Sequence, residues 1–330
     1  MATYDPALYD DSVAGGDFDM AKKIFAANAL EIFKQETLAW PLITKEALTG
    51  AVSKEFIKYG ALSAEAHTPG ATITGQTMTK DTVLIRLEDK ETIAYANQSK
   101  RDALISHWDH AGALAKEAGS ALAQTFDKHT LQQAILAAQT AADSVGPGGQ
   151  ALTSPRSAGG GTIALEYPVS SDGSKMLQDD IAEIVQKMRE DNVPESEQIY
   201  CFLKYREHRV LRQDDSLLSY DFTDGQFSDK LKGKLTMVEN CIVIPTNNFP
   251  QTDLSANTWP TIGGSVAYDA DFRKCVAVLF TKQALAAVYA EGITAEWDWI
   301  PQTRVWQIGA AAMKGIGTYR QECAGYIAIA

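Results

Sequence analysis

Residues 99–142 read SKRDALISHWDHAGALAKEAGSALAQTFDKHTLQQAILAAQTAA, and they hold one helical pattern for longer than any other part of the chain. Apolar residues recur at spacings of three and four, which places them on one face of an α-helix. The members of this face are Leu104, Trp108, Ala111, Ala115, Ala118, Leu122, Leu131, Ile135 and Ala138. The spacing therefore predicts one long helix with a buried side.

Both ends of this helix carry sequence signals. Ser99 followed by Asp102 resembles a capping box, whose side chains satisfy free N–H groups of the first turn. The Gly- and Pro-rich stretch 144–149 cannot extend a helix. At about 1.5 Å per residue the helix would be roughly 60 Å long, and would cross a globule of roughly 50 Å. Gly112 and Gly119 are points where it could bend, and two shorter helices of an α/β enzyme are the alternative.

The chain has 330 residues and a formal net charge of −12. This negative charge argues against general nucleic-acid binding, which needs a positive surface. A protein with an acidic surface could still surround DNA, because it would repel the phosphates and not bind them. We expect no membrane span, because no run of about 18 apolar residues occurs, and no signal peptide. The four cysteines form no CxxC motif, so we expect buried, reduced thiols of a cytoplasmic protein.

The first half of the chain divides into an arm and an extended excursion. Residues 1–53 form the predicted arm, with five aspartates and no basic residue in 1–20 and a helix at 20–36 that Trp40-Pro41 ends. Residues 54–98 predict strands, because large apolar residues alternate with polar ones. Residues 63–81 are small and polar and cannot bury themselves. We therefore expect them to contact something outside their own subunit.

The second half predicts a mixed domain after a glycine-rich linker at 144–162. The linker lacks the G-x-x-x-x-G-K-[ST] spacing of a phosphate-binding loop. We predict helices at 175–191, 204–212 and 282–290, and strands at 199–203, 235–244, 275–280 and 325–329. The run Ile199–Leu203 is apolar throughout, which favours a central strand.

Few residues suggest a catalytic, metal-binding or ligand-binding site. His107 and His110 could share a helical face, but no third metal ligand is evident. The acidic pairs Asp179–Asp180 and Asp214–Asp215 are more typical of solvated helix ends than of a cation site. Trp297 and Trp299 could stack on a sugar, although sheet packing is the simpler interpretation. We predict no catalytic residue, cofactor or metal.

The order of arm, β excursion, long helix and mixed domain resembles the major capsid protein of tailed bacteriophages, of the short-tailed, podovirus-like kind. Two segments carry the resemblance best. One is Ala66-His67-Thr68-Pro69-Gly70 with the strand 82–85 and a helix beginning near Arg101. The other is Gly309–Gly325, although Arg320-Gln321-Glu322 stands where the family commonly has Arg-Pro-Glu.

The resemblance implies the α+β fold shared by tailed-phage and herpesvirus capsid proteins. It assigns residues 54–98 to a β-hairpin E-loop, 99–145 to the spine helix of a peripheral domain, 146–292 mainly to an axial domain, and 293–330 to closing strands that the two domains share. It implies a virion protein whose copies assemble in the host cytoplasm into hexamers and pentamers of an icosahedral shell. It also implies a scaffolding protein and a portal as partners, and loosely held double-stranded DNA inside the shell. The alternatives are an encapsulin-like compartment and a soluble α+β enzyme with an acidic metal site.

Nine residues are candidates for contacts between subunits. Six lie in the excursion, and three lie in the basic run at 204–212, which an acidic neighbour could bind. They are His67, Pro69, Gly70, Ile73, Met78, Lys80, Arg206, Arg209 and Arg212.

Overall fold

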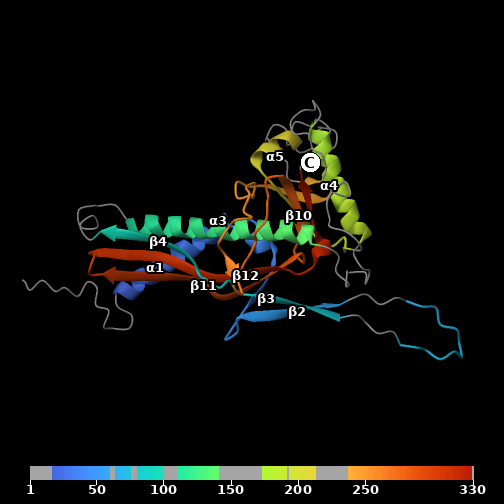
Figure 1. The fold of residues 1–330 in the computed structure, drawn as a ribbon, viewed down its shortest axis with the longest axis horizontal. Coiled ribbons are helices and arrows are strands. Elements are labelled where there is room, and N and C mark those ends of the chain that lie inside the picture. Colours follow the sequence, from blue (N-terminus) through green and yellow to red (C-terminus); the bar gives the residue numbers. More distant parts are fainter. Residues whose placement is uncertain are drawn as a thin grey trace, which may run out of the picture.

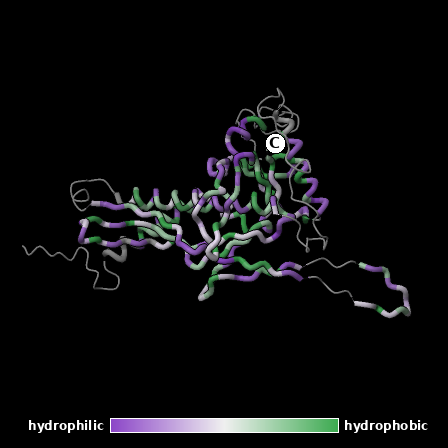
Figure 2. The backbone as a smooth tube through the Cα atoms, viewed as in Figure 1, coloured by the Kyte–Doolittle hydropathy of each residue, from purple (hydrophilic) through white to green (hydrophobic). Residues whose placement is uncertain are grey.

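The computed structural model describes residues 17–59, 64–75, 80–99, 110–140, 173–191, 193–212 and 237–328. An elongated body contains a long helix and a sheet, and a smaller unit rises from one end of it (Figure 1). A β-hairpin projects away from the body. Hydrophobic residues gather where the body and the smaller unit meet, whereas the projecting hairpin is mixed (Figure 2).

The long helix is α3 (His110–Gln139), with 30 residues and a length of about 45 Å. Its face from Ala115 to Ala138 is buried, as predicted, with Leu122 and Ile135 at 1% and 0% exposure. The predicted start at Ser99 is wrong, because Ser99 is the last residue of a strand and pairs with Val305. Leu104 and Trp108 lie outside the described residues.

Helix α1 (Asp17–Glu36) packs against α3, and a glycine permits their close approach. A Cβ at Gly119 would lie 2.5 Å from the backbone oxygen of Ala29, so a larger residue would push the helices apart. Gly119 thus serves packing between the two helices. Of the apolar residues in α1, Phe25 and Phe33 are buried, whereas Ile24 is 56% exposed.

A short helical turn, η2 (Trp40–Leu42), follows α1 and is fixed to α3 by one side chain. The carboxylate of Asp127 accepts backbone N–H groups from Leu38, Ala39 and Trp40 at 2.9–3.1 Å. Three donors that would otherwise lie free at the start of a helix are thereby satisfied. The sequence predicted that Trp40-Pro41 lies just after the first helix. In the structure α1 ends at Glu36, and Trp40 and Pro41 begin the turn η2.

The sheet of the body has the order β1–β11–β12–β4. Its strands are β1 (Thr44–Ala47), β11 (Leu285–Ile300), β12 (Val305–Thr318) and β4 (Thr92–Ser99). The helix predicted at 282–290 is wrong, since β11 pairs with β12 over nearly its whole length and with β1 in parallel. Residues 285–288 are fully buried, so tertiary pairing overrides the helical preference of an Ala-rich run.

The smaller unit holds a second sheet in the order β13–β10–β5–β7–β6. Its strands are β13 (Ala324–Ala328), β10 (Cys275–Thr281), β5 (Ile199–Leu203), β7 (Cys241–Pro245) and β6 (Met237–Val238). The central position predicted for 199–203 is confirmed. The predicted strand 235–244 is divided by a turn at Glu239 and Asn240, both with positive φ. Helices α4 (Gly173–Glu190) and α5 (Tyr205–Leu211) confirm two further predictions.

The remaining strands form two small hairpins. The projecting hairpin pairs β2 (Ser53–Tyr59) with β3 (Lys80–Arg86), and a short one pairs β8 (Thr261–Ile262) with β9 (Ser265–Val266). All four cysteines are buried and free, as expected. None of the described helices is long and apolar enough to cross a membrane.

Candidate assembly surfaces

The β2–β3 hairpin and residues 64–75, here called the E-loop hairpin, have two unlike faces. The inner face carries Phe56 and Ile85, at 7% and 3% exposure, which pack on Leu48 and on Val288 of β11. The outer face carries Ile57, Tyr59 and Leu84, which are 46–48% exposed. Ile57 pairs with Thr82, so Leu84 is its diagonal neighbour. A two-stranded sheet with apolar residues on both faces is typical of an element covered on both sides.

The described part of the hairpin tip, residues 64–75, is exposed throughout. Five of the predicted contact residues are exposed there or at the start of β3, and Met78 lies outside the described residues. Ile73 is 76% exposed and Gly70 has a φ of 89°. The exposed residues are His67, Pro69, Gly70, Ile73 and Lys80. The tip therefore has an apolar side chain with little cover from its own chain.

The base of the hairpin is fixed to β12 and to the segment after it. The Tyr319 hydroxyl donates to the Ile57 carbonyl at 3.1 Å, and its ring lies 5.7 Å from that of Phe56. A Cβ at Gly315 would lie 1.9 Å from the Arg86 oxygen, so only glycine allows this approach. Burial raises the pKa of the Glu322 carboxyl, while the Arg320 and Lys58 cations oppose the rise. These contacts set the direction in which the hairpin leaves the body.

A buried polar cluster lies where the end of β3 meets α3 and β12. Glu88 accepts the Tyr268 hydroxyl at 3.1 Å, and that hydroxyl accepts the Ile316 N–H at 2.9 Å. The His129 Nδ1 atom lies 3.6 Å from Glu88, beyond hydrogen-bond range. The Lys314 ammonium lies 3.9 Å from the centre of the Phe126 ring, within cation–π range. The cluster joins the hairpin base to the long helix.

Burial controls the charges in this cluster. Burial and the nearby Lys314 cation lower the pKa of His129 to about 4, so the imidazole is neutral at pH 7. Burial also lowers the pKa of Lys314 to about 8, although Glu88 and Asp127 favour its charged form. Within the described residues, Lys314 Nζ, Glu88 Oε2 and His129 Nδ1 are buried without a hydrogen-bond partner. Sequence reasoning missed this cluster because its members are far apart along the chain.

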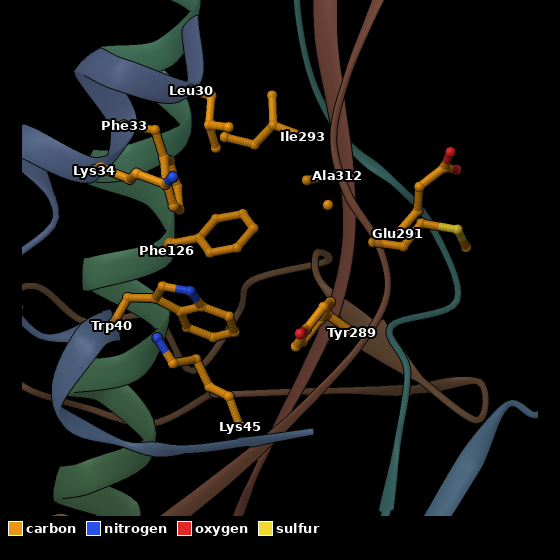
Figure 3. A pocket seen from close by; sticks show the side chains of 12 residues that line it. Leu30, Phe33, Lys34, Trp40, Lys45, Phe126, Tyr289, Glu291, Ile293 and Ala312 are labelled. Carbon is orange, nitrogen blue, oxygen red and sulfur yellow. The ribbon is translucent and has the colours of Figure 1, made fainter. Parts of the chain in front are cut away.

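A pocket of about 300 Å³ opens between α1, α3 and β11 (Figure 3). Its floor is aromatic: the Phe126 ring meets those of Phe33 and Trp40 edge-on at 5.1 and 4.9 Å. The pairing of β11 with β12 shifts register between Tyr289 and Thr294, and this bulge forms the opposite wall. Nothing in the sequence pattern indicated this pocket.

Two lysines line the same pocket. The Lys45 ammonium lies 5.5 Å from the centre of the Trp40 ring, and burial together with Lys282 lowers its pKa. Lys34 comes from α1 (Figure 3). Neither lysine forms an ion pair within the described part of the chain. The pocket therefore combines an apolar floor with two ammonium donors.

The predicted basic run forms one exposed side of α5. Arg206, Arg209 and Arg212 are exposed, and Tyr205 is 60% exposed. The other side is buried through Glu207, His208 and Leu211. The structure thus places the three arginines at exposed positions on α5 and at its C-terminal end.

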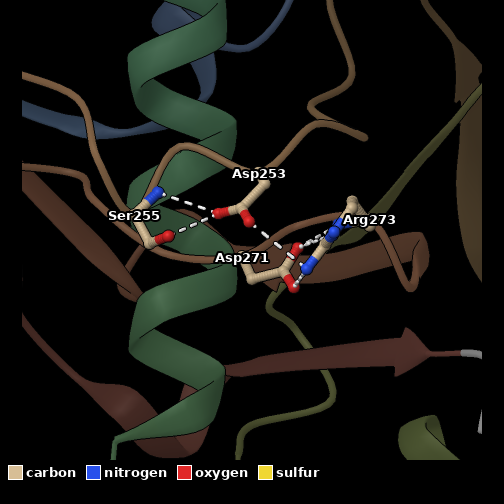
Figure 4. Close-up of polar contacts among 4 residues, drawn as sticks. All are labelled: Asp253, Ser255, Asp271 and Arg273. Carbon is tan, nitrogen blue, oxygen red and sulfur yellow. Dashed lines mark hydrogen bonds and ion pairs between the residues drawn. The ribbon is translucent and has the colours of Figure 1, made fainter.

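The acidic groups do not form a metal site among the described residues. Burial and the neighbouring Glu183 and Asp179 raise the pKa of Asp180 to about 6. Asp253 and Asp271 lie close together but share Arg273, which binds them at 3.2 and 2.6 Å (Figure 4). The hydrogen bonds from Arg273 lower the pKa of Asp271 to about 2. His107 and Asp214–Asp215 lie outside the described residues.

Comparisons with known proteins agree with one another on the fold. The family model described as Gp10A-like major capsid protein matches residues 56–328. No curated protein matches the chain. The capsid of the cyanophage P-SCSP1u is similar with a TM-score of 0.71 and 22% identity, covering 89% of this chain and 88% of that chain.

Two further solved structures are similar over most of their length. The mature capsid of bacteriophage PhiM1 has a TM-score of 0.70 and 16% identity, covering 89% of this chain and 87% of that chain. The Mycobacterium phage Che8 structure has a TM-score of 0.59 and 15% identity, covering 88% and 90%. At these identities the likeness shows a shared fold.

Proposed function

We propose, because the chain belongs to the Gp10A-like family of major capsid proteins, that its copies assemble as hexamers and pentamers into an icosahedral phage head. The family and the α+β capsid fold expected from the sequence are confirmed. The protein is therefore a structural component of a virion and acts as a homo-oligomer.

The E-loop hairpin carries this proposal. Its inner face is buried on its own subunit, but Ile57, Tyr59 and Leu84 on its outer face are nearly half exposed. Apolar side chains gathered on a projecting hairpin indicate an interface. A neighbouring subunit that covers this face would bury them, and burial of apolar surface is the main favourable term in association.

The finer assignments belong to the same proposal. The body, with α3, would be the peripheral domain, and the smaller unit would be the axial domain near the capsomer centre. The exposed arginines of α5 would then contact acidic groups of an adjacent copy. A scaffolding protein and a portal would guide assembly in the host cytoplasm before DNA enters.

The net charge of −12 supports a loose contact with that DNA. An acidic wall repels phosphate, so packaged duplex would pass along it without sequence preference. The comparisons give no support to an encapsulin-like compartment or to an enzyme with an acidic metal site.

Size-exclusion chromatography tests the proposal. The protein is expressed with its scaffolding protein, and the elution volume is compared with that of the protein expressed alone. We expect particles of many subunits in the void volume of the co-expression sample. A monomer or dimer in that sample contradicts the proposed function.

A further inference from the structure

Positive charge gathers at the pocket between α1, α3 and β11, although the chain as a whole is acidic. The chain has 42 acidic and 30 basic residues, yet Lys34 and Lys45 both line this pocket. Burial and the charge of Lys282 lower the pKa of Lys45, so a third cation acts at the same place. Of the described residues that line the pocket, Glu291 alone carries a carboxylate, and it points away from the aromatic floor (Figure 3). The pocket therefore favours an anion.

The remaining surface of the pocket is apolar and open to water. The rings of Phe33, Trp40 and Phe126 form the floor, and Leu30 beside them is 37% exposed. A ligand that covers these groups removes apolar surface from water, which favours binding. The volume of about 300 Å³ lies at the lower end of the range of about 300–1,000 Å³ for small-molecule sites. The pocket can thus hold one small apolar group.

The polar groups of the pocket are mainly hydrogen-bond donors. An ammonium group can only donate, and the phenol of Tyr289, which also lines the pocket, can donate as well. A nucleobase carries N–H donors of its own, and these would stay unpaired against the apolar wall at a cost in free energy. A hydrocarbon that ends in a carboxylate has acceptors only. Its chemistry matches the pocket better than that of a nucleotide.

We propose that this pocket is a binding site for a small apolar carboxylate of the medium-chain fatty-acid class. The hydrocarbon lies on the rings of Phe33, Trp40 and Phe126. The carboxylate pairs with Lys45, whose ammonium lies 5.5 Å from the centre of the Trp40 ring, and Lys34 adds positive charge nearby. A hydrogen bond between two ionised groups is stronger than one between neutral groups. The site lies within one subunit, so the inference goes beyond the proposed function and does not depend on how shells assemble.

Calorimetric titration of soluble, full-length subunits with decanoate tests the site, at concentrations below those at which decanoate forms micelles. We expect one decanoate to bind per subunit. Decanol has the same hydrocarbon without the charge, and we expect wild type to bind it about tenfold more weakly, because the pairing with Lys45 is lost. This comparison uses the wild-type protein alone, so it does not depend on the folding of any variant.

Substitution of the lysines shows where the charge acts. Lys45→Met keeps an apolar side chain but removes the ammonium, and it should weaken decanoate binding by about tenfold while leaving decanol binding unchanged. Lys34→Met should weaken decanoate binding less. Lys23→Met is the matched control, because Lys23 is exposed on the same helix as Lys34 but does not line the pocket. It should bind decanoate as wild type does.

A charge reversal at the apolar wall gives a second measurement of the position. Leu30→Asp places a carboxylate at a side chain that is already 37% exposed, so the fold should be kept and decanoate binding should be lost. Ile24→Asp, on the same helix at 56% exposure and away from the pocket, is the matched control and should bind normally.

Three results would overturn the inference. The first is that wild type does not bind decanoate. The second is that Lys45→Met or Leu30→Asp binds decanoate no more weakly than its matched control. The third is that decanoate binds only after residues 2–16 are deleted, since the N-terminal segment of the chain would then be the occupant of the pocket.

Discussion

Tyr268 satisfies two buried groups through one hydroxyl, which donates to Glu88 and accepts the Ile316 N–H. Tyr268→Phe would leave a carboxylate oxygen and a backbone N–H without this partner. We predict a loss of about 1–3 kcal/mol in the free energy of unfolding, the usual cost of unsatisfied buried groups. Chemical denaturation of soluble subunits measures it.

Tyr205→Phe is the matched control for this substitution. Its hydroxyl belongs to a side chain that is 60% exposed, so water replaces any lost contact and stability should stay within about 0.5 kcal/mol of wild type. If both variants unfold at the wild-type denaturant concentration, the cluster around Glu88 does not stabilise the subunit.

His129 makes the stability of the subunit depend on pH. Its pKa falls from the ordinary 6.5 to about 4 on folding, so between these values the unfolded chain binds more protons. Folding stability from this group is therefore complete above pH 6.5 and is lost as the pH falls toward 4. The titratable groups that act on or contact His129 are Glu88, Lys314, Lys128 and Tyr268.

The variant His129→Phe keeps a ring against Tyr268 and Trp259 but cannot be protonated. We predict that it loses less stability than wild type between pH 6.5 and 4, measured by denaturant unfolding at each pH. Asp180 has a raised pKa, so it makes the folded state more stable as the pH falls, opposite to His129. Both proteins contain Asp180, so its contribution cancels when their stabilities are compared. Parallel pH curves would mean that the pKa of His129 does not change on folding.

At the scale of elements, the crossing of α1 over α3 depends on Gly119. A Cβ there meets the Ala29 carbonyl at 2.5 Å, and a backbone atom cannot move aside cheaply. We predict that Gly119→Ala lowers the unfolding free energy by about 1–3 kcal/mol, as overpacking does. Gly292→Ala, where a Cβ meets nothing within 4 Å, should change it by less than about 0.5 kcal/mol. An unchanged melting temperature for Gly119→Ala would show that the helices can separate without cost.

The sequence predicted an element correctly where the hydrophobic pattern of that element alone determines its structure. The buried faces of α3 and α4 follow from helical spacing, and the central place of β5 follows from its apolar run. Pairing between distant segments was harder to predict. Residues 285–290 favour a helix locally, but β1 and β12 hold them as a strand, and Ser99 is held in β4 by Val305.

Some of the candidate surfaces could be predicted from local sequence, and others could not. The exposed tip residues and the arginines of α5 were predicted from composition, because polar segments without a core lie at the surface. The pocket brings together residues as far apart in the sequence as Leu30 and Met313, and the buried cluster joins Glu88 to Lys314, so no local pattern indicates either.

The tip of the E-loop hairpin should be dispensable for folding and necessary for assembly. Neither of the hydrophobic clusters formed by the described residues includes a residue of the stretch 64–75. We predict that deletion of 68–79 leaves the circular dichroism spectrum of the subunit close to wild type but abolishes shells in electron micrographs. Normal shells from the deletion protein would show that the tip is not an assembly element, and loss of folding would place it in the subunit core.

At the scale of the whole molecule, a hairpin with an exposed apolar face projects from a subunit that has its own hydrophobic core. One hydrophobic cluster contains residues from the sheet of the body and from the sheet of the smaller unit, so the two parts share a core within a single subunit. The hairpin extends beyond this core with apolar groups on its outer face, and the pocket lies elsewhere on the body. An apolar face that projects beyond the subunit's own core can be buried by another copy, and repetition of such a contact can build closed rings and shells.

Electron cryomicroscopy of particles assembled with the scaffolding protein tests this account most directly. We predict closed icosahedral shells in which the outer face of every E-loop hairpin, with Ile57, Tyr59 and Leu84, is buried on a neighbouring subunit. Absence of shells, or shells in which these three side chains remain in solvent, would contradict the account.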